Sequence, residues 1–124
     1  MQHDVLADCF SAIKNAEVVG KKECFSPVSN LIKSVLEVIK SRGYIEDYER
    51  AGKRFRIKLN HKINDCRVIK PRFSFKKGDF EKWEKRYLPA TGFGIIIVST
   101  PKGIITHEKA KKEGTGGKLL GYVY

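Results

Sequence analysis

The C-terminal third of the chain contains two apolar runs, and each adjoins a turn rich in hydroxyl groups and glycine. The run Ile95 to Val98 ends in Ser99-Thr100-Pro101-Lys102-Gly103. The run Leu119 to Tyr124 follows Gly114-Thr115-Gly116-Gly117-Lys118. Short apolar runs bounded by such residues are typical of buried strands. We therefore expect two core strands here, each joined to a turn at which another backbone could approach closely.

The N-terminal half shows helical periodicity first. Apolar residues at helical spacing predict a first helix over residues 4–16. After a polar turn, a very short strand is predicted at Cys24-Phe25. Ser26-Pro27 has the form of an N-cap followed by proline at the first helical position, and Gly43 is a natural stop. These signals predict a second helix between them.

A hairpin is predicted next, with strands at residues 44–49 and 54–60 around Arg50–Lys53. The second strand alternates between apolar and basic residues, which predicts one face toward a core and one toward water or phosphate. The apolar residues are Phe55, Ile57 and Leu59, and the basic ones are Arg54, Arg56 and Lys58.

The second half is predicted to be rich in strands. Residues 60–67 lack periodicity and suit a linker, and strands are predicted at 68–73, 93–98 and 118–124. Residues 77–87 fit either a short helix or a loop held by Trp83, whereas Thr106 caps a predicted helix that ends at Gly114. The expected fold class is α+β, with an N-terminal α-β-α-β-β lobe at 1–62 and a mostly β lobe with a short helix at 63–124.

The charge balance of the chain indicates what kind of partner it binds. The 124 residues include 25 Lys and Arg against 14 Asp and Glu, a net charge of +11, which is typical of a nucleic-acid-binding domain. A soluble domain that is merely basic, or one that binds acidic lipid, has the same balance. The three cysteines are widely spaced without a C-x-x-C pair, so neither a disulfide framework nor a metal site is expected. We expect no cofactor, no membrane span and a cytoplasmic location.

The candidate motifs have plain structural alternatives. Ser99 and Thr100 suit contacts to RNA hydroxyls, phosphates and base edges, but they also fit an ordinary turn. The segment Gly114 to Lys118 fails the nucleotide-binding pattern, because Lys112 and Leu119 occupy two of its required positions. It still suits backbone contact to a polynucleotide phosphate. The histidines are expected at the surface or in turns, although a catalytic pairing of Ser99 with His107 is conceivable.

A basic segment with aromatic rings is a further candidate, at Lys76 to Tyr87. Charge beside a ring suits single-stranded or loop RNA. Because Asp79, Glu81 and Glu84 dilute its charge, a solvated face with Tyr87 packed inward is the alternative.

Several of these pieces resemble the family of ribosomal protein eight of the small subunit. The similarity rests on Val98 to Gly103, Thr106 to Ala110 and Thr115 to Tyr124, which appear in the order of that family's C-terminal signature. Asp4 to Ala16 and Ser29 to Tyr48 are similar to its opening elements. Ile69 to Phe73 and Glu81 to Pro89 look like its archaeal and eukaryotic-cytosolic branch.

The resemblance implies a two-lobed protein that binds the central domain of small-subunit rRNA directly and supports subunit assembly without catalysis. It implies neighbouring ribosomal proteins as further partners. The RNA-binding residues that it implies, with nearby lysines, are Ser99, Thr100, Lys102, Gly103, Thr115, Gly116, Gly117, Lys118 and, in the first lobe, Lys14 and Asn15. Pro101 departs from the family pattern and removes one backbone donor from the turn.

Two other functions fit the residues. A regulator that binds messenger RNA would use the same chemistry as an rRNA-binding protein. A small hydrolase would need Ser99 as the nucleophile and a histidine as its base.

Overall fold

The computed structural model describes residues 4–70, 72–76, 78–90 and 93–124. The chain folds as two compact units, residues 1–67 and 68–124. The lobe boundary predicted from the sequence lies slightly earlier, between residues 62 and 63. That these lobes are separate domains stays a prediction.

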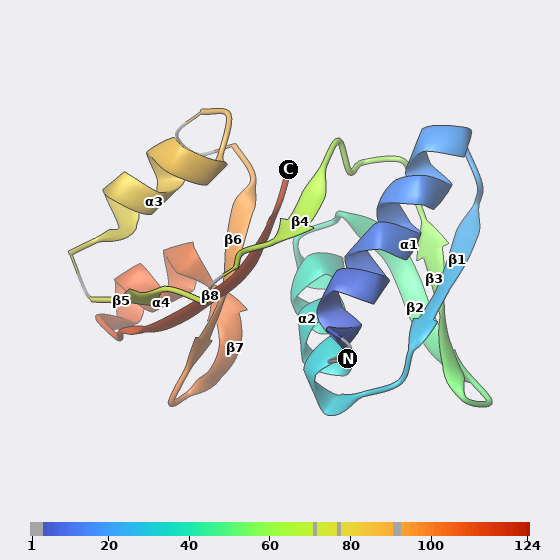
Figure 1. Cartoon of the computed structure of the whole chain (residues 1–124), viewed down its shortest axis with the longest axis horizontal. Coiled ribbons are helices and arrows are strands. Elements are labelled where there is room, and N and C mark those ends of the chain that lie inside the picture. The colour runs from blue at the N-terminus through green and yellow to red at the C-terminus, as the bar shows by residue number, and fades with distance from the viewer. Residues whose placement is uncertain (1–3, 71, 77, 91–92) are drawn as a thin grey trace. The chain divides into compact units, whose positions relative to one another are not determined.

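The first unit has the α-β-α-β-β order that the sequence predicts. Its three strands form an antiparallel sheet in the order β1-β3-β2, and Figure 1 shows both helices on one face of it. The elements are α1 (Val5–Val19), β1 (Glu23–Pro27), α2 (Asn30–Ser41), β2 (Ile45–Ala51) and β3 (Arg54–Leu59).

Helix α1 is bounded by two strong local signals. The Asp4 carboxylate accepts the N–H groups of Leu6 and Ala7, each at 3.1 Å, and so caps the first turn. Gly20 ends the helix in the left-handed conformation, with φ of 75°. The helix is longer than predicted because no residue before Gly20 interrupts it.

Helix α2 begins later than the sequence predicts. Ser29, and not Ser26, is its N-cap, with the Ser29 hydroxyl 3.1 Å from the N–H of Ile32. Ser26 and Pro27 belong to β1, where they pair with Phe55 and Arg54 of β3. The predicted cap at Ser26-Pro27 is therefore wrong, because strand pairing takes these residues before the helix starts.

The predicted β2–β3 hairpin is confirmed, as is the burial of Phe55, Ile57 and Leu59. The basic face of β3 is less positive than its own sequence suggests. Arg56 forms an ion pair with Glu49 on one neighbouring strand, and its Nε lies 3.9 Å from a Glu23 oxygen on the other. Acidic residues therefore interleave this face.

The second unit is a sheet in the order β4-β8-β6-β7, with β5 paired to β8. Strand β4 (Cys66–Val68) crosses the boundary between the units and lies partly within the predicted linker. The remaining elements are β5 (Ser74–Phe75), α3 (Phe80–Tyr87), β6 (Ile95–Thr100), β7 (Gly103–Thr106), α4 (His107–Glu113) and β8 (Gly117–Val123). Of the predicted strand at 68–73, only Val68 is regular, and Pro71 lies outside the described residues.

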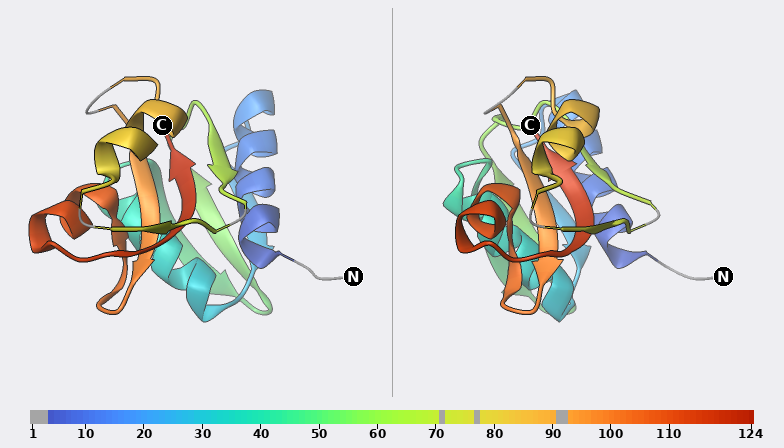
Figure 2. Two further views of the ribbon diagram at one scale, coloured as in Figure 1. Left: turned by 60° about the vertical axis from the view of Figure 1, so that its left-hand side comes forward. Right: turned by 90° about the vertical axis from the view of Figure 1, so that its left-hand side faces the viewer.

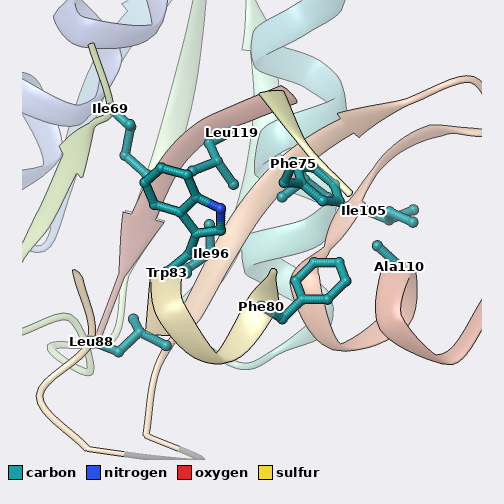
Figure 3. Close-up of a cluster of buried hydrophobic side chains, with 10 residues drawn as sticks. Ile69, Phe75, Phe80, Trp83, Leu88, Ile96, Ile105, Ala110 and Leu119 are labelled. Atoms are coloured by element: carbon teal, nitrogen blue, oxygen red, sulfur yellow. The ribbon is translucent and has the colours of Figure 1, made fainter. Parts of the chain in front are cut away.

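Helices α3 and α4 lie on the same side of this sheet (Figures 1 and 2), and a buried apolar cluster joins them to it. Figure 3 shows Trp83 and Phe80 of α3 facing Leu119, Ile96 and Ile105 of the strands. Helix α3 thus resolves the helix-or-loop alternative for residues 77–87, although Lys77 itself lies outside the described residues. The cluster fixes the strands whose ends carry the candidate site.

Candidate nucleic-acid interface

The predicted Ser-Thr turn is the end of a strand and the start of a hairpin. Ser99 and Thr100 are the last residues of β6, and the hairpin returns as β7, which the sequence interpretation missed. Ser99 pairs with Ile104 on β7 and with Lys118 on β8, while Thr100 pairs with Gly103. The exposed turn between the strands is Pro101-Lys102. Ser99 therefore sits in the middle of three strands, not in a loose loop.

The Thr100 hydroxyl closes the turn from inside. It donates to the carbonyl of Gly103 at 2.8 Å and accepts the N–H of Lys102 at 3.2 Å. Only 9% of Thr100 is exposed. The side chain therefore shapes the turn and has little capacity left for a ligand, so any part in recognition is indirect.

The Ser99 hydroxyl, unlike that of Thr100, is not used within the turn. Because side chains alternate along a strand, Ser99 points to the side of β6 opposite Thr100. It is half-buried, and within the described ranges its hydroxyl makes no hydrogen bond. A hydroxyl is both a donor and an acceptor. Ser99 therefore offers a hydroxyl that can both donate and accept a hydrogen bond, as contacts to RNA require.

Gly103 is required by backbone conformation and not by crowding. Its φ is +118°, and a Cβ built on it would meet nothing within 4 Å. An L-residue rarely adopts that conformation, so the sharp return into β7 depends on glycine. The open space around it keeps the turn accessible from outside.

The glycine turn is packed directly against the serine-threonine turn. A Cβ on Gly117 would lie 2.0 Å from the carbonyl oxygen of Ser99 and 3.2 Å from the Cα of Thr100. A Cβ on Gly116 would lie 2.8 Å from the carbonyl oxygen of Phe75 in β5. The structure thus brings the two predicted turns together, backbone against backbone.

The rest of the glycine turn completes the surface. Gly114 ends α4 with φ of 67°, and the Thr115 hydroxyl lies 3.3 Å from the carbonyl oxygen of Gly116. Lys118 is exposed and is flanked in register by Ser99 and by Ser74 of β5. The sequence interpretation did not select Ser74, because no local signal indicates that a two-residue strand will lie beside Lys118.

Positive charge concentrates in this unit. Residues 68–124 contain 12 Lys and Arg against 5 Asp and Glu, whereas residues 1–67 contain 13 against 9. Lys102 and Lys118 are both exposed, and neither forms a salt bridge among the residues that the structure describes. Their charges are thus available to an anionic ligand.

Lys14 and Asn15 lie in the first unit, near the C-terminal end of α1. Lys14 already has a partner, since its Nζ lies 3.0 Å from an Asp65 oxygen. Burial opposes ionisation of Asp65, but the hydrogen bond and charge of Lys14, with smaller help from Arg67 and the Cys66 N–H, lower its pKa overall. Asn15 is exposed. A phosphate at Lys14 would therefore compete with Asp65.

Comparison with known proteins identifies the family of the chain. The family model described as "Ribosomal protein S8" matches residues 4–124, which include both turns and α1. The chain belongs to the ribosomal protein S8 family. It is 49% identical to the small ribosomal subunit protein uS8 of Archaeoglobus fulgidus over 129 aligned positions, with all of both chains covered.

His107 links two elements of the second unit. The residue is buried, with 2% exposed, so its predicted surface location is wrong. Its Nδ1 accepts the N–H of Ile96 at 3.0 Å, and its Nε2 lies 3.3 Å from a Glu84 oxygen. Both ring nitrogens are therefore engaged in linking β6 to α3, and neither is available as a base for Ser99.

Among the described residues, no group of three or more His, Cys, Asp or Glu is suited to hold a metal ion, and no helix is long and apolar enough to cross a membrane. Burial raises the pKa of the Cys9 thiol to about 12 and that of Cys24 to about 11. In this member of the ribosomal protein S8 family, those thiols are part of the core.

Proposed function

We propose that this chain is a structural constituent of the small ribosomal subunit, that it binds the central domain of small-subunit rRNA directly, and that it supports subunit assembly without catalysis. Its place would then be the cytoplasmic ribosome, beside other small-subunit proteins. Support comes from the family and from the full-length relative named as a small-subunit protein.

The observation that carries the RNA-binding part is the contact between the two turns. Gly117 has no side chain, so the backbone of β8 lies against the Ser99 carbonyl and leaves the Ser99 hydroxyl beside Lys118. The result is a rigid surface on which the Ser99 hydroxyl, which can both donate and accept a hydrogen bond, lies between the exposed Lys102 and Lys118. RNA offers 2′-hydroxyls, base edges and phosphates at short range, which this surface fits.

The predicted residues then divide the task. Ser99 and the backbone around Gly116 and Gly117 recognise the local shape of the RNA. Thr100 and Gly103 hold the turn in the conformation that presents Ser99. The lysines supply phosphate contacts, which raise affinity for any RNA. The residues assigned to phosphate are Lys102, Lys118 and, on the first unit, Lys14, with Thr115 and Asn15 as polar contacts.

Binding of the full chain to a central-domain RNA fragment and to an unrelated RNA duplex tests this division. Ser99→Ala should weaken binding to the fragment about three- to tenfold, as expected for one hydrogen bond, and leave the duplex unchanged. Lys118→Ala should weaken both and reduce the salt dependence by about one unit.

The matched control is Lys85→Ala. Lys85 lies on α3 with its Nζ 3.5 Å from a Glu81 oxygen, so its charge already has a partner, unlike that of Lys118 among the described residues. An equal loss on both RNAs from Ser99→Ala would exclude the recognition role, and a Lys85→Ala effect equal to that of Lys118→Ala would exclude the phosphate assignment.

A further inference from the structure

The first unit has an open sheet edge beside a groove. Strand β1 is the outer strand of the order β1-β3-β2 (Figure 1), so only one of its sides is paired. A groove runs between this strand and α1. It is lined by Ala12, Asn15, Ala16, Val19, Lys21, Glu23, Cys24 and Phe25.

The strand register shows which backbone groups face outward. The Leu59 N–H donates to the Lys22 carbonyl at 2.8 Å, and Lys22 stands one position before the pair Glu23–Lys58. In antiparallel strands, hydrogen-bonded pairs alternate with pairs that are not. Cys24 and Ser26 therefore bond to β3, whereas the N–H and carbonyl groups of Glu23 and Phe25 point away from it.

The side chains around this edge are apolar and exposed. Among the described residues, the large apolar side chains that are exposed include Val18 at 78%, Val19 at 67% and Phe25 at 45%. Val19 and Phe25 line the groove, whereas Val18 lines a different hollow with Lys14 and Ile63. Exposed apolar side chains gathered in one place mark interaction sites more often than isolated ones do.

This edge carries some of the protections that natural sheets use, including the charged side chain of Glu23. Lysines and prolines stand only at its two ends, as Lys21, Lys22 and Pro27. Between them lie the outward backbone groups of Glu23 and Phe25, which need an extended backbone as partner and not a helix or a phosphate.

We propose that β1 receives an extended segment of another protein, which adds to this sheet as a fourth strand. The segment pairs with Glu23 and Phe25, turns small or β-branched apolar side chains toward Ala16 and Val19, and places an acidic residue near Lys21 and Lys22. Apart from Asn15, which lines the groove and is also assigned as a polar contact to RNA, this surface uses none of the residues assigned to RNA recognition.

Amide hydrogen exchange on the free chain provides the first test. Glu23 and Phe25 should exchange rapidly, whereas Cys24 and Ser26, bonded to β3, should exchange slowly. Slow exchange of all four would show that the edge is already covered and would overturn the proposal. This measurement uses the unmodified chain and depends on no variant.

Photo-crosslinking in cells provides the second test, with p-benzoylphenylalanine at position 19 in the groove. Phe25→Pro removes the outward N–H but keeps the hydrogen bonds of Cys24 and Ser26 to β3, because the pair Phe25–Arg56 is not a hydrogen-bonded one. Phe25→Ala is the matched control, since it removes the same ring and keeps the N–H. We expect one crosslinked polypeptide, with about tenfold lower yield for Phe25→Pro than for Phe25→Ala.

The same experiment separates the alternatives. A crosslink to RNA would show that a nucleic acid covers this face, and absence of any crosslink would show that nothing does. Equal yields for the two variants would show a contact made through side chains alone. Each of these three results would overturn strand addition.

Discussion

Gly117→Ala tests the contact that joins the two turns. The added Cβ would lie 2.0 Å from the Ser99 carbonyl oxygen, and Cβ atoms in proteins essentially never come within 3.0 Å of such an atom. The two backbones must therefore separate by about 1 Å. Ser99 is held between β7 and β8, so the movement disturbs the Ser99–Lys118 pairing.

The expected loss follows from those two effects. Overpacking costs about 1–3 kcal/mol, and one or two weakened backbone hydrogen bonds add about 1 kcal/mol each. Gly117→Ala should therefore lower the free energy of unfolding by about 2–5 kcal/mol. A domain whose stability lies well above about 5 kcal/mol, within the typical range of about 5–15 kcal/mol, remains folded after that loss. The folded variant should bind the central-domain RNA fragment more weakly, because its two turns no longer meet.

Urea unfolding followed by circular dichroism measures the change, with two graded controls. Gly116→Ala, with a Cβ 2.8 Å from the Phe75 carbonyl oxygen, should be intermediate. Gly78→Ala has open space and should change stability by less than about 1 kcal/mol. If Gly117→Ala is no more destabilising than Gly78→Ala, the close backbone contact is not a feature of the protein.

Three further predictions concern single side chains. Thr100→Val should destabilise the chain by about 1–2 kcal/mol in urea unfolding, whereas Thr100→Ser, which keeps both hydrogen bonds, should change it by less than 1 kcal/mol. Because burial raises the pKa of Cys9 and Cys66 to about 12, neither should react with a thiol reagent at pH 8 until the chain unfolds, and immediate labelling would contradict their burial. The pKa of Asp65 is lowered despite its burial, because Lys14 interacts with the ionised carboxylate. The ionised carboxylate therefore stabilises the fold fully above pH 3.8, and this contribution is lost as the pH falls through the lower pKa of the folded state. Asp65→Asn should remove about 0.5–1 kcal/mol at pH 6 and flatten the acid side of the stability profile measured by urea unfolding.

Elements whose signals are local were predictable from the sequence. The Thr106 cap and the stop at Gly114 need only their own neighbours to act, and both were predicted. The stop at Gly20 is equally local, but the predicted helix ended at residue 16. The amphipathic pattern of residues 54–59 likewise predicted β3 and its buried face correctly.

Elements that depend on distant partners were not predictable in the same way. Ser26-Pro27 satisfies the local rule for a helix start, but it pairs with residues 54 and 55 far along the chain. The helix loses nothing by this, since Ser29 supplies another cap. Similarly, β5 forms because Ser74 and Phe75 pair with the start of β8. No residue near Ser74 in the sequence indicates this contact.

The candidate site shows the same division. Its two turns were visible as hydroxyl- and glycine-rich segments, but the reason for Gly117 is a carbonyl eighteen positions earlier in the chain. The inward role of Thr100 depends on the carbonyl of Gly103, whose position is known only once β7 is seen. The burial of His107 depends on Glu84 from another helix. The RNA-binding assignments of these residues stay predictions.

The most direct measurement of the proposed function is crosslinking of the chain to RNA in cells, followed by sequencing of the attached RNA. We expect one site in the central domain of small-subunit rRNA to dominate, and Gly117→Ala to reduce its share. Dominance of a messenger RNA, or crosslinks spread evenly over many RNAs, would contradict the account.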